Sequence, residues 1–138
     1  MMRNTEERAT AIPMTEPTIK RAAERNWTEK YTRNCPLPLQ EEILIKDGRS
    51  GLEISTAYYP AGYNTVLHRH TIAHGMYVLS GRLQTSEGIL EPGDFIWYPE
   101  GAAMEHGAPP DSDCTVLFIT NGPFDIEYLQ QEKDHEEK

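Results

Sequence analysis

The sequence predicts an all-β fold built as one barrel or sandwich of short strands. Between residues 38 and 129, short runs rich in β-branched and aromatic residues alternate with turn residues at intervals of about 8–12 positions. No sustained helical periodicity occurs in this region. At 138 residues, the chain suits a single domain that buries a core without disulfide or metal support.

The expected strands follow one another between clusters of Gly, Pro, Asp and Asn. The first two flank a turn at 47–51 and place Ile43 and Ile45 against Leu52 and Ile54. Four turn clusters and the break at 60–62 separate the later strands. These strands are expected at 65–70, 76–79, 82–85, 94–98 and 115–120.

The two ends of the chain differ in composition from the β region. Residues 1–34 are polar, and Pro13 and Pro17 interrupt any long helix, so we expect a partly ordered extension in which 19–27 either forms a short helix or drapes over the domain. Residues 130–138 form a charged tail. The predicted domain therefore spans 35–129, between these two segments.

The charge balance excludes several function classes. Lys and Arg number 13 against 22 Asp and Glu, which gives a net charge of -9 and argues against nucleic-acid binding. No apolar run approaches the ~20 residues of a membrane helix. The first ten residues are polar and lack the apolar stretch of a secretory signal, so we expect a cytoplasmic protein. Cys35 and Cys114 are expected to be reduced thiols, because neither sits in a CxxC pair.

Four of the five histidines lie in the predicted β region, and the fifth, His135, lies in the charged tail. His68 and His70 are two positions apart in an expected strand, so their side chains leave the same face of the sheet. In a closed barrel one of the two faces is the interior, where paired imidazoles are costly unless they are protonated in water or share a partner such as a metal. His74 and His106 complete the candidate set. A surface position for His106, or an exposed face for the pair, is the alternative.

The spacing around these histidines resembles two motifs of the cupin superfamily. The first motif is matched by Gly62-x5-His68-x-His70-x3-His74-x6-Gly81, and the start of the second by Gly93-x5-Pro99-x-Gly101. The resemblance covers about residues 40 to 128 and implies a single cupin barrel, a double-stranded β-helix or jelly roll. It also implies one divalent transition metal near the open end, held by His68, His70, His74 and His106.

Two departures from the cupin pattern affect the expected site. His74 stands where the motif has a glutamate ligand, which gives a four-histidine set without a carboxylate. Met104 stands at the usual histidine position of the second motif, and His106 follows two residues later. Both side chains can point inward from one strand with Glu105 outward, because residues i and i+2 share a face. The alternative is a longer turn after Gly101.

Imidazole ligands suit Fe, Mn, Ni, Cu or Zn, and the sequence does not distinguish among these metals. Four neutral ligands leave the metal charge uncompensated, which favours binding of enolates, carboxylates or reduced oxygen species. Tyr98 and Met104 are the preferred pocket residues. Strand parity also turns three aliphatic side chains inward, where plain core packing is the alternative role. These three are Met76, Val78 and Ile96.

The opposite face of the strand at 94–98 carries Phe95 and Trp97. Exposed aromatic residues there suggest cover by the N-terminal segment or by a second subunit, and the cupin resemblance favours a homodimer. Glu100 and Glu105 flank the metal motif, where a surface role is preferred over that of a general base.

Three functions fit this site. The preferred one is a non-haem oxygenase, of the dioxygenase kind, that acts on a small carbonyl, diketone or enol-type molecule. The second is a metal-dependent isomerase, lyase or cyclase, and the third is a sensor of a small molecule or metal without turnover. Cupin resemblance alone does not choose among them, because one fold carries many activities.

Overall fold

The computed structural model describes residues 14–32, 34–122 and 126–128. The predicted tail at 130–138 and the first 13 residues lie outside this part of the chain. A short 3-10 helix, η1 (Ala22–Glu24), falls within the segment 19–27 where the sequence allows one. The strands are β1 (Thr28–Lys30), β2 (Leu39–Lys46), β3 (Glu53–Tyr59), β4 (His68–His70), β5 (His74–Gly81), β6 (Leu83–Thr85), β7 (Gly88–Leu90), β8 (Phe95–Tyr98), β9 (Ala103–Met104), β10 (His106–Gly107), β11 (Cys114–Thr120) and β12 (Ile126–Tyr128).

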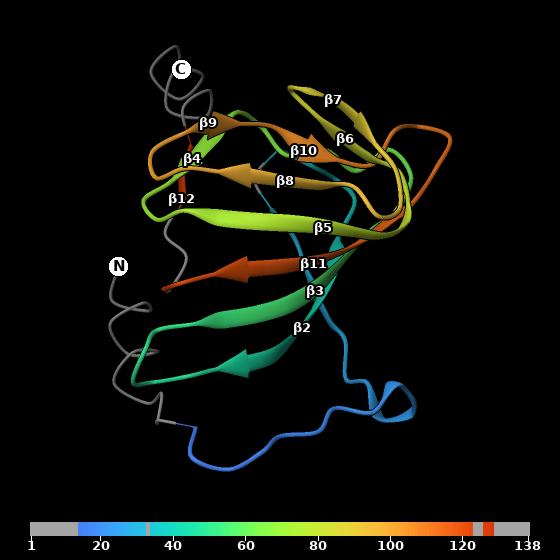
Figure 1. Cartoon of the computed structure of the whole chain (residues 1–138). Helices are drawn as coiled ribbons and strands as arrows, with labels where there is room; N and C mark the ends of the chain where they lie inside the picture. The colour runs from blue at the N-terminus through green and yellow to red at the C-terminus, as the bar shows by residue number, and fades with distance from the viewer. Residues whose placement is uncertain (1–13, 33, 123–125, 129–138) are drawn as a thin grey trace.

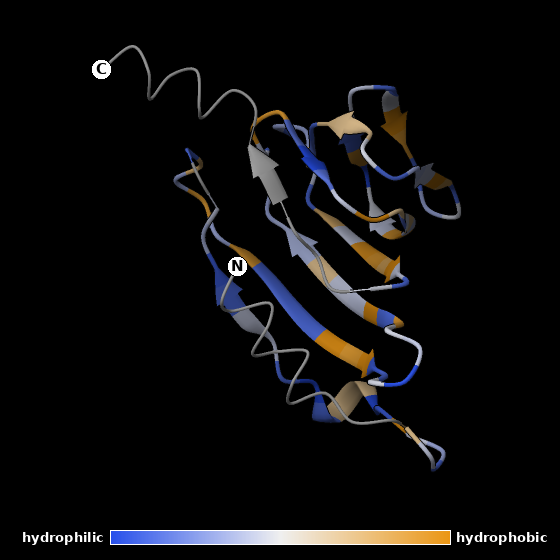
Figure 2. Cartoon of the chain, turned by 90° about the vertical axis from the view of Figure 1, so that its left-hand side faces the viewer, coloured by the Kyte–Doolittle hydropathy of each residue, from blue (hydrophilic) through white to orange (hydrophobic). Residues whose placement is uncertain are grey.

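The strands form three antiparallel sheets. The large sheet has the order β1-β2-β3-β11-β5-β8, and the small sheets have the orders β10-β6-β7 and β12-β4-β9. In Figure 1 the large sheet crosses the front of the molecule, and the two small sheets lie together at its top. Figure 2 shows the same arrangement from the side, with the N-terminal segment at the β2 end of the large sheet and the small sheets at the β8 end. The all-β prediction is therefore confirmed.

The hairpin of β2 and β3 has the predicted turn and a modified register. Asp47 accepts hydrogen bonds from the backbone nitrogens of Arg49 and Ser50, which closes the turn. Ile45 lies opposite Ile54, but Ile43 pairs with Ser55 because a bulge separates Ile43 from Ile45. An extra residue in one strand shifts the pairing on one side of the bulge, and hydrophobic pairing alone does not reveal it.

The core lies on the face of the large sheet that turns toward the small sheets. Alternate residues of β11 are buried: Cys114, Val116, Phe118 and Thr120. Val116 lies opposite Val78 of β5 and Ala57 of β3, and all three are nearly inaccessible to solvent. Burying each large aliphatic side chain contributes about 1.5–3 kcal/mol. This period-2 alternation fixes which face of each strand turns toward the site.

The N-terminal segment is attached to the other face of the large sheet. Glu42 of β2 lies in register with Thr56, and Thr56 with Leu117, on the face opposite the core. Nε of Arg25 lies 2.8 Å from Glu42, and the backbone nitrogen of Asn26 donates a 2.9 Å hydrogen bond to it. These contacts bury Glu42 and cover the outer face at β2. No helix among the described residues is long and apolar enough to cross a membrane.

Candidate metal centre

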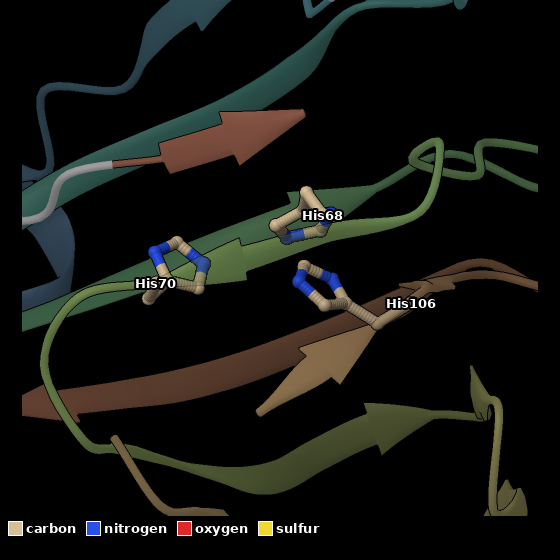
Figure 3. A group of neighbouring side chains, drawn as sticks. All are labelled: His68, His70 and His106. Carbon is tan, nitrogen blue, oxygen red and sulfur yellow. The ribbon is translucent and has the colours of Figure 1, made fainter. Parts of the chain in front are cut away.

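Three buried histidines from two strands of the small sheets lie close together: His68 and His70 of β4, and His106 of β10. His68 and His70 leave β4 on one face and are 2% and 4% exposed, whereas Arg69 between them is partly exposed, as the parity of the strand predicts. His106 arrives from β10, and Figure 3 shows the three rings turned toward one another. One ligand nitrogen from each lies within 4.8 Å of the others. Nitrogens this close fit a shared metal ion.

His74 lies beside this group at the start of β5. Its side chain is fully buried, and its ring centroid lies 4.5 Å from that of His70. The imidazole also stacks on Phe118 at 4.9 Å, with 13° between the planes. The structure therefore places all four predicted histidines together, with His74 at the edge of the three-histidine group. Ligation by His74 stays a prediction.

The hydrogen bond of His68 determines which of its nitrogens faces the group. Its Nδ1 lies 2.7 Å from the carbonyl oxygen of Val66. A carbonyl only accepts, so Nδ1 carries the proton, and the neutral ring has its lone pair on Nε2. Metal-binding histidines typically donate their second ring nitrogen to an acceptor of this kind. His68 is therefore held in a ligand-competent form.

The backbone of His106 is fixed by Thr65. The Thr65 hydroxyl hydrogen-bonds the backbone of His106, and the backbone nitrogen of Thr65 donates to the His106 carbonyl at 3.1 Å. Gly107 packs so closely on the Tyr63 carbonyl that a Cβ would clash with it. Among the described residues, Nε2 of His106 is buried without a hydrogen-bond partner. This nitrogen is therefore available to bind a metal.

The expected single strand through Met104 and His106 is wrong in one respect. Met104 belongs to β9, which pairs with β4, whereas His106 belongs to β10, which pairs with β6. The chain changes sheet at Glu105, whose carbonyl accepts a hydrogen bond from the Ser86 nitrogen. Met104 and His106 are nevertheless both buried, as the i, i+2 argument predicts.

Burial keeps the four imidazoles neutral. The pKa of His70 is lowered to about 2 and that of His74 to about 4, and desolvation is the largest cause in each case. It also lowers the pKa of His68, and holds the pKa of His106 well below the ordinary value. Neighbouring imidazoles lower the pKa of His70, His74 and His106 further. Neutral imidazoles bind metals and imidazolium does not, so the residues fit a metal.

These shifts predict that the metal-free protein loses stability in mild acid. Below the ordinary histidine pKa of 6.5, His70 and His74 are protonated in the unfolded chain but stay neutral in the folded protein. The free energy of unfolding should fall by about 1.4 kcal/mol per pH unit for each histidine that stays neutral. Urea midpoints of chelator-treated protein, measured between about pH 7 and pH 5, test this. Equal midpoints would contradict buried neutral histidines. Asp47 does not interfere, because its lowered pKa affects stability only below its ordinary value of 3.8.

A protein-family model matches residues 38–125 of the chain, and its description is ChrR cupin-like domain. The chain belongs to this cupin family. No curated protein matches the chain by sequence. The solved structures show the cupin fold, and their sequence identities are too low to transfer an activity.

Three of these structures carry different descriptions. The polyketide cyclase RemF of Streptomyces resistomycificus is 20% identical, with a TM-score of 0.66 and coverage of 81% of this chain and 86% of that chain. A candidate acetylacetone dioxygenase of Methylibium petroleiphilum is 14% identical, with a TM-score of 0.63 and coverage of 80% and 83%. A chain in the complex of Rhodobacter sphaeroides SigE with the anti-sigma ChrR is 20% identical, with a TM-score of 0.57 and coverage of 72% and 50%.

The five predicted pocket residues of the cupin lie in or against the buried core. Four of them belong to the buried core cluster, namely Met76, Val78, Tyr98 and Met104, and Ile96 packs against it. The Tyr98 ring lies 5.1 Å from that of His74, and Met104 lies opposite His68. Burial raises the pKa of Tyr98 to about 12, so it remains a neutral phenol. Their role in binding a ligand stays a prediction.

Charged groups around the cupin site are few. No Lys or Arg is buried among the described residues. Glu100 is exposed, whereas Glu105 is partly buried and close enough to His68 to oppose the lowering of its pKa. A general-base role for either glutamate stays untested.

Sequence reasoning missed three residues that contact the histidines of this cupin. Phe118 stacks on His74, Thr65 holds the His106 backbone, and the Tyr59 hydroxyl lies 3.4 Å from Nδ1 of His106. Residues 116–119 are all apolar, so the sequence pattern there does not tell which face Phe118 takes. Nothing local to Thr65 or Tyr59 indicates His106, which follows more than 40 residues later.

Proposed function

We propose that this cupin binds one divalent transition metal through His68, His70, His74 and His106, and that it acts as a non-haem oxygenase on a small carbonyl, diketone or enol-type molecule. The observation that carries the proposal is the convergence of buried, neutral imidazoles, with nitrogens of three of them within 4.8 Å. The donor set contains no carboxylate among the described residues, because the position that carries a glutamate in the cupin motif is His74. The fold of the candidate acetylacetone dioxygenase supports the same direction.

A metal at this site supplies Lewis acidity toward carbonyl and enolate oxygens and, if redox-active, electrons for the reduction of dioxygen. The chain itself supplies orientation and a dry environment. Met104, Tyr98 and Met76 present two thioethers and a neutral phenol, and no Lys or Arg of the described segments is buried to balance an anionic substrate. Four neutral ligands would leave a bound metal strongly electrophilic, so its charge would be available to balance that of an enolate.

Metal analysis and oxygen uptake test this function together. Protein purified without a histidine tag is expected to contain about one transition metal per chain, and to consume oxygen with a simple 1,3-diketone as the probe substrate. The His68→Ala variant serves as the control for oxygen uptake by free metal. A metal-free wild type would overturn the site, and a metal-loaded wild type without oxygen uptake on a panel of diketones and enols would overturn the oxygenase.

Two alternatives have support from specific observations. The structural likeness to RemF favours a metal-dependent cyclase, isomerase or lyase, which converts its substrate in the absence of oxygen. The family description and the SigE–ChrR likeness favour a sensor of a metal or small molecule without turnover. Anaerobic turnover identifies the first, and ligand binding without any product identifies the second.

We propose an extension at 1–34, a cupin barrel at 35–129 and a charged tail at 130–138, in a cytoplasmic protein whose ligand is a small molecule rather than nucleic acid or a membrane.

We also propose a homodimer through the outer face of β5 and β8. Tyr77, Leu79, Phe95 and Trp97 lie on this face and are 41–51% exposed. A Cβ on Gly75 would lie 2.6 Å from the Phe95 ring, so the glycine lets the aromatic rings lie flat across the sheet. The described N-terminal segment lies at the β2 end and leaves this face uncovered. In a two-fold symmetric dimer the same surface of each subunit packs against its copy, so this apolar face of one chain would cover that of the other.

The dimer predicts a specific effect of charge at Trp97. Trp97→Glu should convert a dimer to a monomer in light scattering coupled to gel filtration, because the buried carboxylate is desolvated without a partner. Tyr31→Glu is the matched control, since Tyr31 is 65% exposed and lies outside this face. A wild type that is monomeric at every concentration would rule out the dimer.

A further inference from the structure

Two stacked tyrosines lie beside His106. Tyr59 ends β3 and is 2% exposed, and Tyr63 is fully buried. Their rings are 5.0 Å apart and nearly parallel, with 4° between the planes. The turn at 60–63 places them together: the Tyr63 nitrogen donates to the Pro60 carbonyl, and Gly62 takes φ +87°. The stack is a rigid support for whatever contacts it.

The Tyr63 end of the stack is anchored to the N-terminal segment. Its hydroxyl lies 2.8 Å from the Thr32 hydroxyl. The Tyr63 carbonyl also accepts a hydrogen bond from the Ala108 nitrogen, two residues after His106. A backbone hydrogen bond therefore joins the stack to the segment that follows His106. Tyr59 packs on the Tyr63 ring, which these contacts hold in place.

The Tyr59 end of the stack meets the metal group. The Tyr59 hydroxyl lies 3.4 Å from Nδ1 of His106, and the two rings lie 5.9 Å apart. Nε2 of His106 is buried and without a hydrogen-bond partner among the described residues. A neutral imidazole carries one proton, so a proton on Nδ1 leaves the lone pair on Nε2. With the proton on Nδ1, Nε2 is the nitrogen left for the metal.

We propose that Tyr59 is a positioning residue of the metal site, whose hydroxyl oxygen accepts the Nδ1 proton of His106 and so holds Nε2 toward the metal. This inference rests on the proposed metal site. The Nδ1 proton of His106 would then have an acceptor, as that of His68 does in the carbonyl oxygen of Val66. Outer acceptors of this kind fix the tautomer and orientation of ligating histidines.

The chemical character of Tyr59 distinguishes it from the carboxylate that often fills this role. Burial raises the pKa of Tyr59 well above its ordinary value, so the phenol stays neutral. Both identified acceptors, a phenol and a peptide carbonyl, are uncharged. The metal site thus gains orientation from its surroundings without gaining negative charge, in line with four neutral ligands.

Tyr59→Phe tests the role, and Tyr63→Phe is its matched control. Both variants remove one hydroxyl from the same buried stack and keep the ring, but the Tyr59 hydroxyl lies beside His106, whereas the Tyr63 hydroxyl lies beside Thr32. We expect zinc affinity, measured by competition with a chromophoric chelator, to fall about 10–100-fold in Tyr59→Phe and by less than about threefold in Tyr63→Phe. Urea unfolding of both metal-free variants shows whether they fold alike. Equal zinc affinity in the two variants would overturn the positioning role while leaving the metal site intact.

A second measurement needs no variant and covers the case in which Tyr59→Phe fails to fold. In zinc-loaded wild type, nitrogen-15 NMR of the His106 side chain should show a protonated Nδ1 and a metal-bound Nε2. Zinc on Nδ1 would overturn the proposal. A wild type that binds no zinc, manganese, iron, nickel or copper overturns the metal site itself, and the positioning role with it.

Discussion

Replacing His68, His70 or His106 by alanine is expected to remove most of the bound metal. Structural zinc sites in small proteins bind with about 10–16 kcal/mol in total, so each of four ligands accounts for about 3 kcal/mol. Loss of one should weaken binding on the order of a hundredfold or more. Elemental analysis after gel filtration and chelator competition measure the loss. The effect should be large for all three, because their nitrogens lie within 4.8 Å of one another.

The same variants carry a clear internal control. Metal binding stabilises only the folded state, so adding zinc should raise the unfolding temperature of wild type and leave that of His106→Ala almost unchanged. His135→Ala removes a histidine from the charged segment 130–138 and should retain full metal binding. One metal per chain in His68→Ala, at wild-type affinity, would show that the metal is bound elsewhere.

Sequence periodicity predicted the parts of this site that a single strand determines. Residues two positions apart in one strand point to the same face of the sheet. This rule placed His68 with His70, and Met76 with Val78. It also placed Tyr98 inward and Trp97 outward, and the structure confirms these orientations. The turn at 47–51 followed from its local composition. These are properties of nearest neighbours in the chain, so no knowledge of the packed fold is needed.

Features that depend on pairing between distant segments were not predictable in this way. The change of sheet at Glu105 depends on which partners are free for β9 and β10, namely β4 and β6. The expected strand at 65–70 is shortened to β4, because Thr65 instead bonds the backbone of His106. Tyr59 meets His106 across a sequence separation of 47 residues. Each of these contacts is set by long-range packing, on which local pattern carries no information.

His74 determines the charge of the proposed site, and two substitutions at this position distinguish a ligand from a neighbour. His74→Glu introduces the carboxylate that the cupin motif has at this position, and His74→Gln has nearly the same shape without the charge. If position 74 ligates, His74→Glu should bind zinc about as tightly as wild type, because a carboxylate is a good ligand. His74→Gln should then bind on the order of a hundredfold more weakly, because it retains only three strong ligands.

The opposite result has an equally definite form. If His74 only packs between His70 and Phe118, at centroid distances of 4.5 and 4.9 Å, the glutamate is a buried group without a metal. It should then be protonated and destabilising, and both variants should bind zinc with the same affinity as His74→Ala. Chelator competition on the three variants, with urea unfolding of their metal-free forms, separates the two cases. A carboxylate ligand also cancels one positive charge, so a ligating His74→Glu should bind an added enolate or carboxylate more weakly than wild type does. A dependence of anion affinity on residue 74 is therefore expected only if this residue ligates the metal. No such dependence is expected if the His74 imidazole only packs beside the site.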